Sequence, residues 1–165
     1  MRQLFVVVLI FLATPLYAGQ GSAVLPFYRS YLVDSNNASS CMFYMSNVTD
    51  ETIDVKVTLY NKTGSVIVDE TSSSITSGRF RGGNVTNWND NPSDGSITFS
   101  LQAENTGFIY IGTESSEYGF GKIEWTSSGS SVYGMVAHGF YTEYKNETIV
   151  IKSRFSIPVQ NGLPF

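Results

Sequence analysis

The sequence predicts an all-β protein that folds as a single antiparallel β-sandwich of about eight to ten strands. Short runs of β-branched and aromatic residues are separated by stretches rich in Gly, Ser, Thr and Asn, which is typical of strands joined by turns. One segment, 52–60, alternates apolar and polar residues throughout. After residue 18, no stretch keeps a helical apolar period over three turns, so we expect at most one short helix.

Residues 1–18 have the features of a secretory signal peptide. Arg2 supplies a positive start, an apolar run extends from Leu4 to Leu12, and Ala18 is a small residue at the predicted cleavage site. The run is too short to span a membrane, which takes about 20 apolar residues. We therefore expect a cleaved signal peptide, a single domain over 19–165, a secreted or periplasmic location and no stable membrane insertion.

The first strand of the mature chain is predicted over 27–33. The segment before it, Gly19–Ala23, consists of small and polar residues and leads into an apolar stretch. This segment has two interpretations. It forms part of the first strand of its own sheet, or it adds as a strand to the open sheet edge of a neighbouring molecule.

The clearest strand is 52–60, because its alternation gives it one core face and one solvent face. The predicted core positions are Ile53, Val55, Val57 and Leu59. Lys56 and Thr58 occupy the opposite, solvent-facing positions. Asn61–Gly64 is a predicted turn, with Gly64 able to take a positive φ, and 65–70 is predicted to return as the partner strand.

A long polar loop separates two groups of strands. Residues 71–96 are rich in Ser, Asn, Asp and Gly, which predicts a loop rather than a strand. The last two strand candidates are long and are expected to bend or break at Gly134, Gly139 or Pro158. Besides 27–33, 52–60 and 65–70, the strand candidates are 40–47, 97–103, 108–113, 119–126, 131–144 and 148–159.

Charge and cysteine content exclude several classes of function. Without Arg2, the mature chain has nine basic and fourteen acidic side chains, a formal charge of −5, and no basic run, so we expect no nucleic-acid partner. Cys41 is the only cysteine and cannot form an internal disulfide. It is interpreted as a buried small hydrophobic residue, with an intermolecular disulfide or a reactive thiol as alternatives.

The sequence gives little indication of catalysis or metal binding. His138 and Cys41 are single residues with no local partner for a nucleophile–base pair, and they are too few for a zinc site. Calcium needs only oxygen ligands, but the spacing in 87–95 does not match an EF-hand, and Asx-capped turns explain the same residues. Carboxylates that could converge as an acidic site are Asp34, Glu104, Glu114, Glu117, Glu124 and Glu143. We expect no enzyme activity, no metal and no cofactor.

The polar loop contains the candidate contact residues Arg79, Phe80, Arg81 and Trp88. Exposed aromatic and arginine side chains are enriched in binding hot spots, so these four are the predicted contact patch. The alternative is that Trp88 folds back over one end of the core and leaves only a solvated loop. A second candidate is 118–121, Tyr-Gly-Phe-Gly, where glycines expose the rings unless these pack in the core.

One stretch resembles known domains. The residues Asn47–Thr52, followed by the alternating strand and Tyr60–Gly64, are similar to the strand–turn–strand pattern of many immunoglobulin-like sandwich domains. The resemblance covers under a sixth of the chain and implies a sandwich, immunoglobulin-like or jelly-roll-like, but no function.

The function predicted from the sequence is binding rather than catalysis. We expect an exported, non-enzymatic β-sandwich that acts at the cell envelope or outside the cell, by binding a protein or glycan or by self-association. Two alternatives remain at this point. Apolar residues alternate before Phe165, as in small outer-membrane barrels, although Pro158, Pro164 and the non-alternating run Cys41–Met45 oppose this. A hydrolase with an acidic site is the other alternative.

Overall fold

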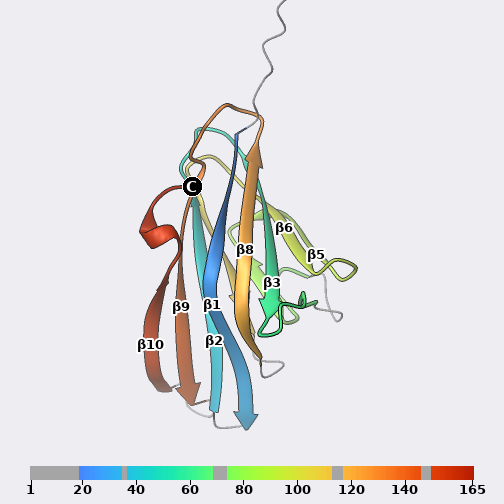
Figure 1. Cartoon of the computed structure of the whole chain (residues 1–165), viewed down its shortest axis with the longest axis vertical. Coiled ribbons are helices and arrows are strands. Elements are labelled where there is room, and N and C mark those ends of the chain that lie inside the picture. The colour runs from blue at the N-terminus through green and yellow to red at the C-terminus, as the bar shows by residue number, and fades with distance from the viewer. Residues whose placement is uncertain (1–18, 35–36, 69–73, 113–116, 146–149) are drawn as a thin grey trace, which may run out of the picture.

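The computed structural model describes residues 19–34, 37–68, 74–112, 117–145 and 150–165, so the predicted signal peptide lies outside it. Within these ranges the chain is all-β and antiparallel, as predicted (Figure 1). A short 3₁₀ helix, η1 (Gln160–Gly162), follows the last strand. The strands are β1 (Gln20–Asp34), β2 (Asn37–Asn47), β3 (Ile53–Asn61), β4 (Phe80–Gly83), β5 (Thr86–Asn91), β6 (Ser96–Leu101), β7 (Thr106–Ile111), β8 (Glu117–Ser127), β9 (Met135–Lys145) and β10 (Val150–Pro158).

The described strands form two layers, which we call sheet A and sheet B. Sheet A has the order β5–β6–β3–β8–β1, and sheet B has the order β10–β9–β2–β7–β4. Strand β1 belongs to both layers, because residues 20–30 pair with β8 and residues 31–34 pair with β2. Residues 20–23 therefore form part of the first strand of their own sheet, with Gln20 opposite Thr126.

The core lies between the two sheets and explains the alternation seen in the sequence. The predicted inward positions of β3 are all buried, with Val57 fully inaccessible. The largest buried side chain is Trp125 of β8, whose indole Nε1 donates a hydrogen bond to the backbone oxygen of Phe165 at 2.7 Å. Gly134 lies directly against this indole, since an added Cβ would come within 2.5 Å of it. A larger residue at Gly134 would therefore displace the tryptophan.

The hairpin after β3 differs in part from the prediction. Gly64 has a φ of 83°, and the Asn61 side-chain oxygen accepts hydrogen bonds from the backbone N–H groups of Thr63 and Ser65. The predicted return strand is reduced to an isolated bridge between Tyr60 and Val66, and residues 69–70 lie outside the described ranges. Thr58, predicted to face solvent, is buried between its cross-strand neighbours Ser96 and Lys122.

The predicted polar loop, 71–96, is corrected by the structure, because it contains β4 and β5. Both strands are short and lie at sheet edges, β4 beside β7 and β5 beside β6. Edge strands are often short and polar, since one side of each faces solvent. Their composition therefore resembles that of a loop, and only Phe80 and Trp88 supply apolar anchors.

Candidate functional site

The structure does not form the predicted contact patch as a surface. Phe80 is only 1% exposed and belongs to the hydrophobic core, so its prediction as a contact residue is wrong. Arg79 is also buried, and its guanidinium pairs with the carboxylate of Glu117 on β8. These two side chains join β4 to the body of the sandwich and are not available to a partner.

The other two predicted contact residues point in different directions. Arg81 is exposed on the outer face of sheet B, where its guanidinium carbon lies 5.7 Å from the centre of the Tyr110 ring. Trp88 is half-buried, packs against the core and stacks on Phe99 with ring centres 6.0 Å apart. Trp88 thus follows the alternative interpretation, in which it covers part of the core, and only Arg81 remains as a surface residue.

Arg81 borders a surface that the sequence analysis did not identify as a site. Side chains at alternate positions of a strand share one face, and the outward positions of three neighbouring strands here carry large apolar groups. We call this surface the aromatic face. It consists of Met42 and Tyr44 on β2, Phe108 and Tyr110 on β7, and His138 and Phe140 on β9. Each of these side chains is half-buried except that of His138, which is exposed.

Strand register arranges the aromatic face in two rows across sheet B. In the first row, Tyr44 lies opposite Phe108 on one side and His138 on the other. The second row has Met42 at its centre, with Tyr110 and Phe140 on either side. Directly opposed side chains in an antiparallel pair are in contact range, so each row is continuous from β7 to β9.

The rings of the aromatic face hold one another in place. Tyr44 and His138 stack with centres 5.4 Å apart and an interplanar angle of 15°. Phe140 stands perpendicular to His138 at 88°, with centres 5.3 Å apart. Phe108 lies 5.9 Å from Tyr44 and extends over Gly83 of β4, where an added Cβ would come within 2.4 Å of the ring. The rings of this surface therefore pack against one another without a partner.

Two arginines border the aromatic face. Arg154 on β10 lies over the Phe140 ring, 4.5 Å from its centre, and Arg81 flanks the opposite side. The five strands of sheet B contain one acidic residue, Glu143, which accepts a hydrogen bond from the Tyr31 hydroxyl at 2.8 Å. The two arginines give the border of this face a positive charge that would attract acidic groups.

The outer face of sheet A has a different character. A shallow groove of about 590 Å³ there is lined by polar residues that include Asp54, Lys56 and Glu124. Its carboxylates are engaged, because Asp54 accepts a hydrogen bond from Ser100 at 2.7 Å and Glu124 pairs with Lys122 at 2.6 Å. This groove mixes both signs of charge within a few residues.

The aromatic segment 118–121 lies on the surface. Tyr118 is 51% exposed and Phe120 is 42% exposed, and Phe120 stacks on Tyr60 with ring centres 5.0 Å apart. Both rings stand on the outer face of sheet A, opposite in the sandwich to the aromatic face. They make a smaller exposed patch, which serves below as a matched control.

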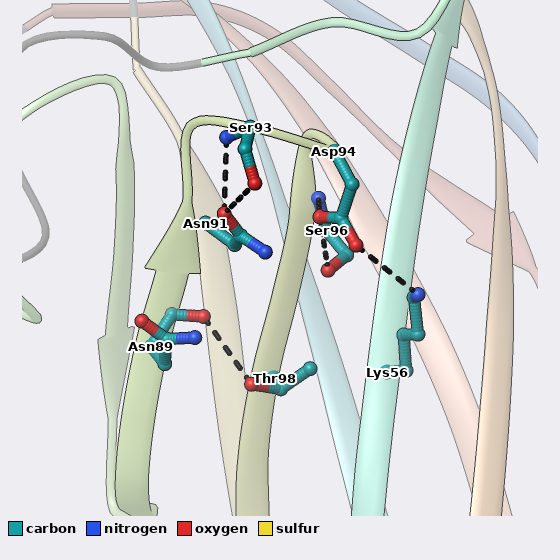
Figure 2. Close-up of polar contacts among 7 residues, drawn as sticks. All are labelled: Lys56, Asn89, Asn91, Ser93, Asp94, Ser96 and Thr98. Atoms are coloured by element: carbon teal, nitrogen blue, oxygen red, sulfur yellow. Dashed lines mark hydrogen bonds and ion pairs between the residues drawn. The ribbon is translucent and has the colours of Figure 1, made fainter.

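Residues 87–95 were considered above as a possible calcium site. In the structure, side-chain oxygens of this segment accept hydrogen bonds that form turns (Figure 2). The Asn91 side-chain oxygen accepts hydrogen bonds from the backbone and hydroxyl of Ser93 at 3.0 and 2.7 Å. Asp94 accepts two from Ser96 and lies 3.6 Å from the Lys56 ammonium group. The Ser96 hydrogen bonds, aided by Lys56, lower the pKa of Asp94. Asx-capped turns explain this composition, as the spacing indicated.

Cys41 and His138 do not form a catalytic pair. Cys41 is fully buried on the inner side of β2, whereas His138 is exposed on the outer side of β9. Burial raises the pKa of the Cys41 thiol to about 11, partly offset by a hydrogen bond with the Arg29 backbone. A thiol in this state is a poor nucleophile near neutral pH.

Three of the dispersed carboxylates have separate partners. Glu117 pairs with Arg79, Glu124 with Lys122 and Glu143 with Tyr31, while Glu114 lies outside the described ranges. Across the described residues, no group of three or more His, Cys, Asp or Glu side chains is placed to hold a metal ion. In the same residues, no helix has the length and apolar character needed to cross a membrane.

Comparison with known proteins carries no argument about the function of this chain. No protein-family model matches the chain, and no curated protein matches it. Among solved structures, one similar chain is a collagen-binding domain from a Staphylococcus aureus adhesin, with 7% sequence identity and a TM-score of 0.22. The alignment covers 93% of this chain and 96% of that domain. A TM-score of this size supports no inference about function, so the class of the protein, an all-β antiparallel sandwich, follows from its own strands.

Proposed function

We propose that this chain is an exported, non-enzymatic binding protein and that the aromatic face of sheet B is its contact surface for a partner protein. The observation that carries the proposal is the row structure of this face, in which aromatic side chains cover three adjacent strands. Export is supported by the signal-peptide features of residues 1–18.

The residue types on the face favour a protein partner. Tyr, Phe, Met and Arg are enriched at the centres of protein interfaces, whereas Asp, Glu and Lys are depleted there. The aromatic face has this composition and is bordered by Arg81 and Arg154. Rings that are already packed against each other lose little conformational entropy on binding, which favours affinity.

The charge at the border of the aromatic face indicates which kind of partner surface would fit it. Two copies of this face packed against each other would bring their arginines together, so self-association through it is disfavoured. A partner surface with acidic groups around an apolar centre would complement it. A glycan is the second candidate, because sugar rings also stack on aromatic side chains, and the basic border would then select acidic sugars.

The proposal is tested by capture of partners from the culture medium and envelope fraction of the native host. We expect the double variant Phe108→Ala, Tyr110→Ala to lose at least about tenfold in affinity, which corresponds to about 1.4 kcal/mol. The matched control is Tyr118→Ala, Phe120→Ala on sheet A, which removes two exposed rings elsewhere and should leave capture unchanged.

Both variants are first compared with wild type by thermal melting, so that loss of folding is not mistaken for loss of binding. Raising the salt concentration should slow association, because the arginine border acts mainly on the rate of encounter. Equal capture by wild type and the aromatic-face variant would contradict the proposal. Capture of a polysaccharide in place of a protein, lost in the same variant, would replace the protein partner by the glycan.

A further inference from the structure

Strand β10 is an open edge of the sandwich. In the described residues it pairs only with β9, and it stands at one side of the molecule (Figure 1). Every residue from 151 to 156 is exposed, including Ile151 at 56% and Phe155 at 48%. An edge strand that exposes large apolar side chains is a template for pairing with another chain, and proteins usually protect such edges.

An apolar groove lies beside this edge, between the margins of the two sheets. It has a volume of about 310 Å³, and we call it the edge groove; its lining consists of Pro26, Phe27, Phe155, Ser156, Ile157 and Pro158. Phe27 reaches into the gap from a register shift in β1 and lies 6.1 Å from the Phe155 ring. A strand added next to β10 would direct alternate side chains into this groove.

The charges on β10 indicate what kind of strand fits. Arg154 points to the outer face, opposite Thr142 of β9. Lys152 lies at a register shift beside it, and its ammonium group donates a hydrogen bond to the side-chain oxygen of Asn37. A second copy is a poor occupant in the two-fold registers that bring these charges together. Two-fold pairing centred on Ser153 would place Lys152 opposite Arg154 of the other copy, and pairing centred on Arg154 would oppose two arginines. Like charges directly opposite each other destabilise an antiparallel pair.

We propose that the free edge of β10 is a docking site for an extended, acidic segment of a partner protein. The segment would add to sheet B as a further strand, with main-chain hydrogen bonds supplying affinity. Acidic side chains on its outward positions would meet Lys152 and Arg154, and apolar side chains on the alternate positions would fill the edge groove. Pro158 has no N–H group and marks the end of the pairing. This site shares Arg154 with the border of the aromatic face, but it does not use the rings of that face.

The test uses a synthetic nine-residue peptide, matched to the length of β10, that alternates glutamate with valine and phenylalanine. In ¹H–¹⁵N spectra of the mature protein we expect it to shift the amide signals of 151–157 and of Phe27. The double variant Lys152→Glu, Arg154→Glu should bind this peptide at least tenfold more weakly. It should in turn bind a peptide with lysine in place of glutamate better than wild type does.

The matched control is Lys56→Glu, Lys122→Glu, which makes the same charge change on exposed lysines of sheet A and should leave peptide binding unchanged. The variant Phe108→Ala, Tyr110→Ala should also bind the peptide normally, which separates this test from that of the aromatic face. Shifts confined to the aromatic face, or none with either peptide, would overturn the proposal. So would sedimentation showing a wild-type dimer that the β10 variant abolishes, because the occupant would then be a second copy.

Discussion

Replacing Phe80 by alanine should destabilise the whole domain, although the sequence suggested that this residue is a contact residue. The side chain is 1% exposed and points from β4 into the core, opposite Ile111 in the β7 pairing. Its sequence neighbour Arg81 points the other way, into solvent. The two substitutions Phe80→Ala and Arg81→Ala therefore separate a packing role from a surface role within one dipeptide.

The expected size of the effect follows from this burial. Removing a buried phenylalanine ring costs about 3–5 kcal/mol, and β4 is a short edge strand that can relax, so we expect about 3 kcal/mol. For a domain of this size, each kcal/mol lowers the melting temperature by about 2–4 °C, which gives a fall of about 6–12 °C. Arg81→Ala loses an exposed cation–π contact with Tyr110 and an exposed hydrogen bond to the Gly78 backbone oxygen, and it should cost under about 1 kcal/mol.

Urea unfolding followed by tryptophan fluorescence measures both variants against wild type. The linear dependence of the unfolding free energy on urea should keep the same slope, since the surface exposed on unfolding is nearly unchanged. A loss below about 1 kcal/mol for Phe80→Ala, equal to that for Arg81→Ala, would refute the packing of β4 against the core. The four-residue contact patch would then have to be reconsidered.

Three further predictions concern the core, the buried thiol and the N-terminus. Leu59→Ala should destabilise by about 2–5 kcal/mol in urea unfolding, whereas Lys56→Ala should change stability by less than about 0.5 kcal/mol, and similar effects would contradict the strand register. Burial raises the pKa of Cys41 from 9.0 to about 11. The stabilisation of the folded state by the protonated thiol is therefore complete below pH 9.0 and is lost as the pH rises to about 11. Urea unfolding between these pH values should show the decline in wild type and a smaller one in Cys41→Ala. Mass spectrometry of protein exported by the native host should find Gly19 as the first residue; retained Met1 on membrane-bound protein would contradict cleavage.

The sequence was sufficient to predict the fold class and the positions of most strands. Alternation in 52–60 identified the buried face of β3, because one side of that strand packs on the core and the other meets solvent. The edge strands β4 and β5 were missed, since a strand with a free edge and few apolar residues has the composition of a loop. Phe80 was consequently assigned to the surface, although a large aromatic residue in a polar stretch equally marks an anchor.

The aromatic face could have been predicted from strands in which apolar and polar residues do not alternate. The run Cys41–Met45 is apolar at every position, and 108–111 reads Phe-Ile-Tyr-Ile. A strand in a two-layer sandwich needs apolar residues on one face only, so such runs indicate a second apolar face directed outward. The pairing of β2 between β7 and β9, which joins these runs into one surface, could not be read from the chain, because it depends on contacts between distant segments.

The position of β1 determines when the molecule can finish folding. Its first residues pair with the far end of β8, so that Gln20 meets Thr126, and its last residues begin sheet B. Closing so long a loop is slow compared with forming local hairpins. During synthesis, a chain lacking residues near 126 has an N-terminal strand without its partner and cannot complete sheet A. Sheet A can therefore close only after most of the chain has been made.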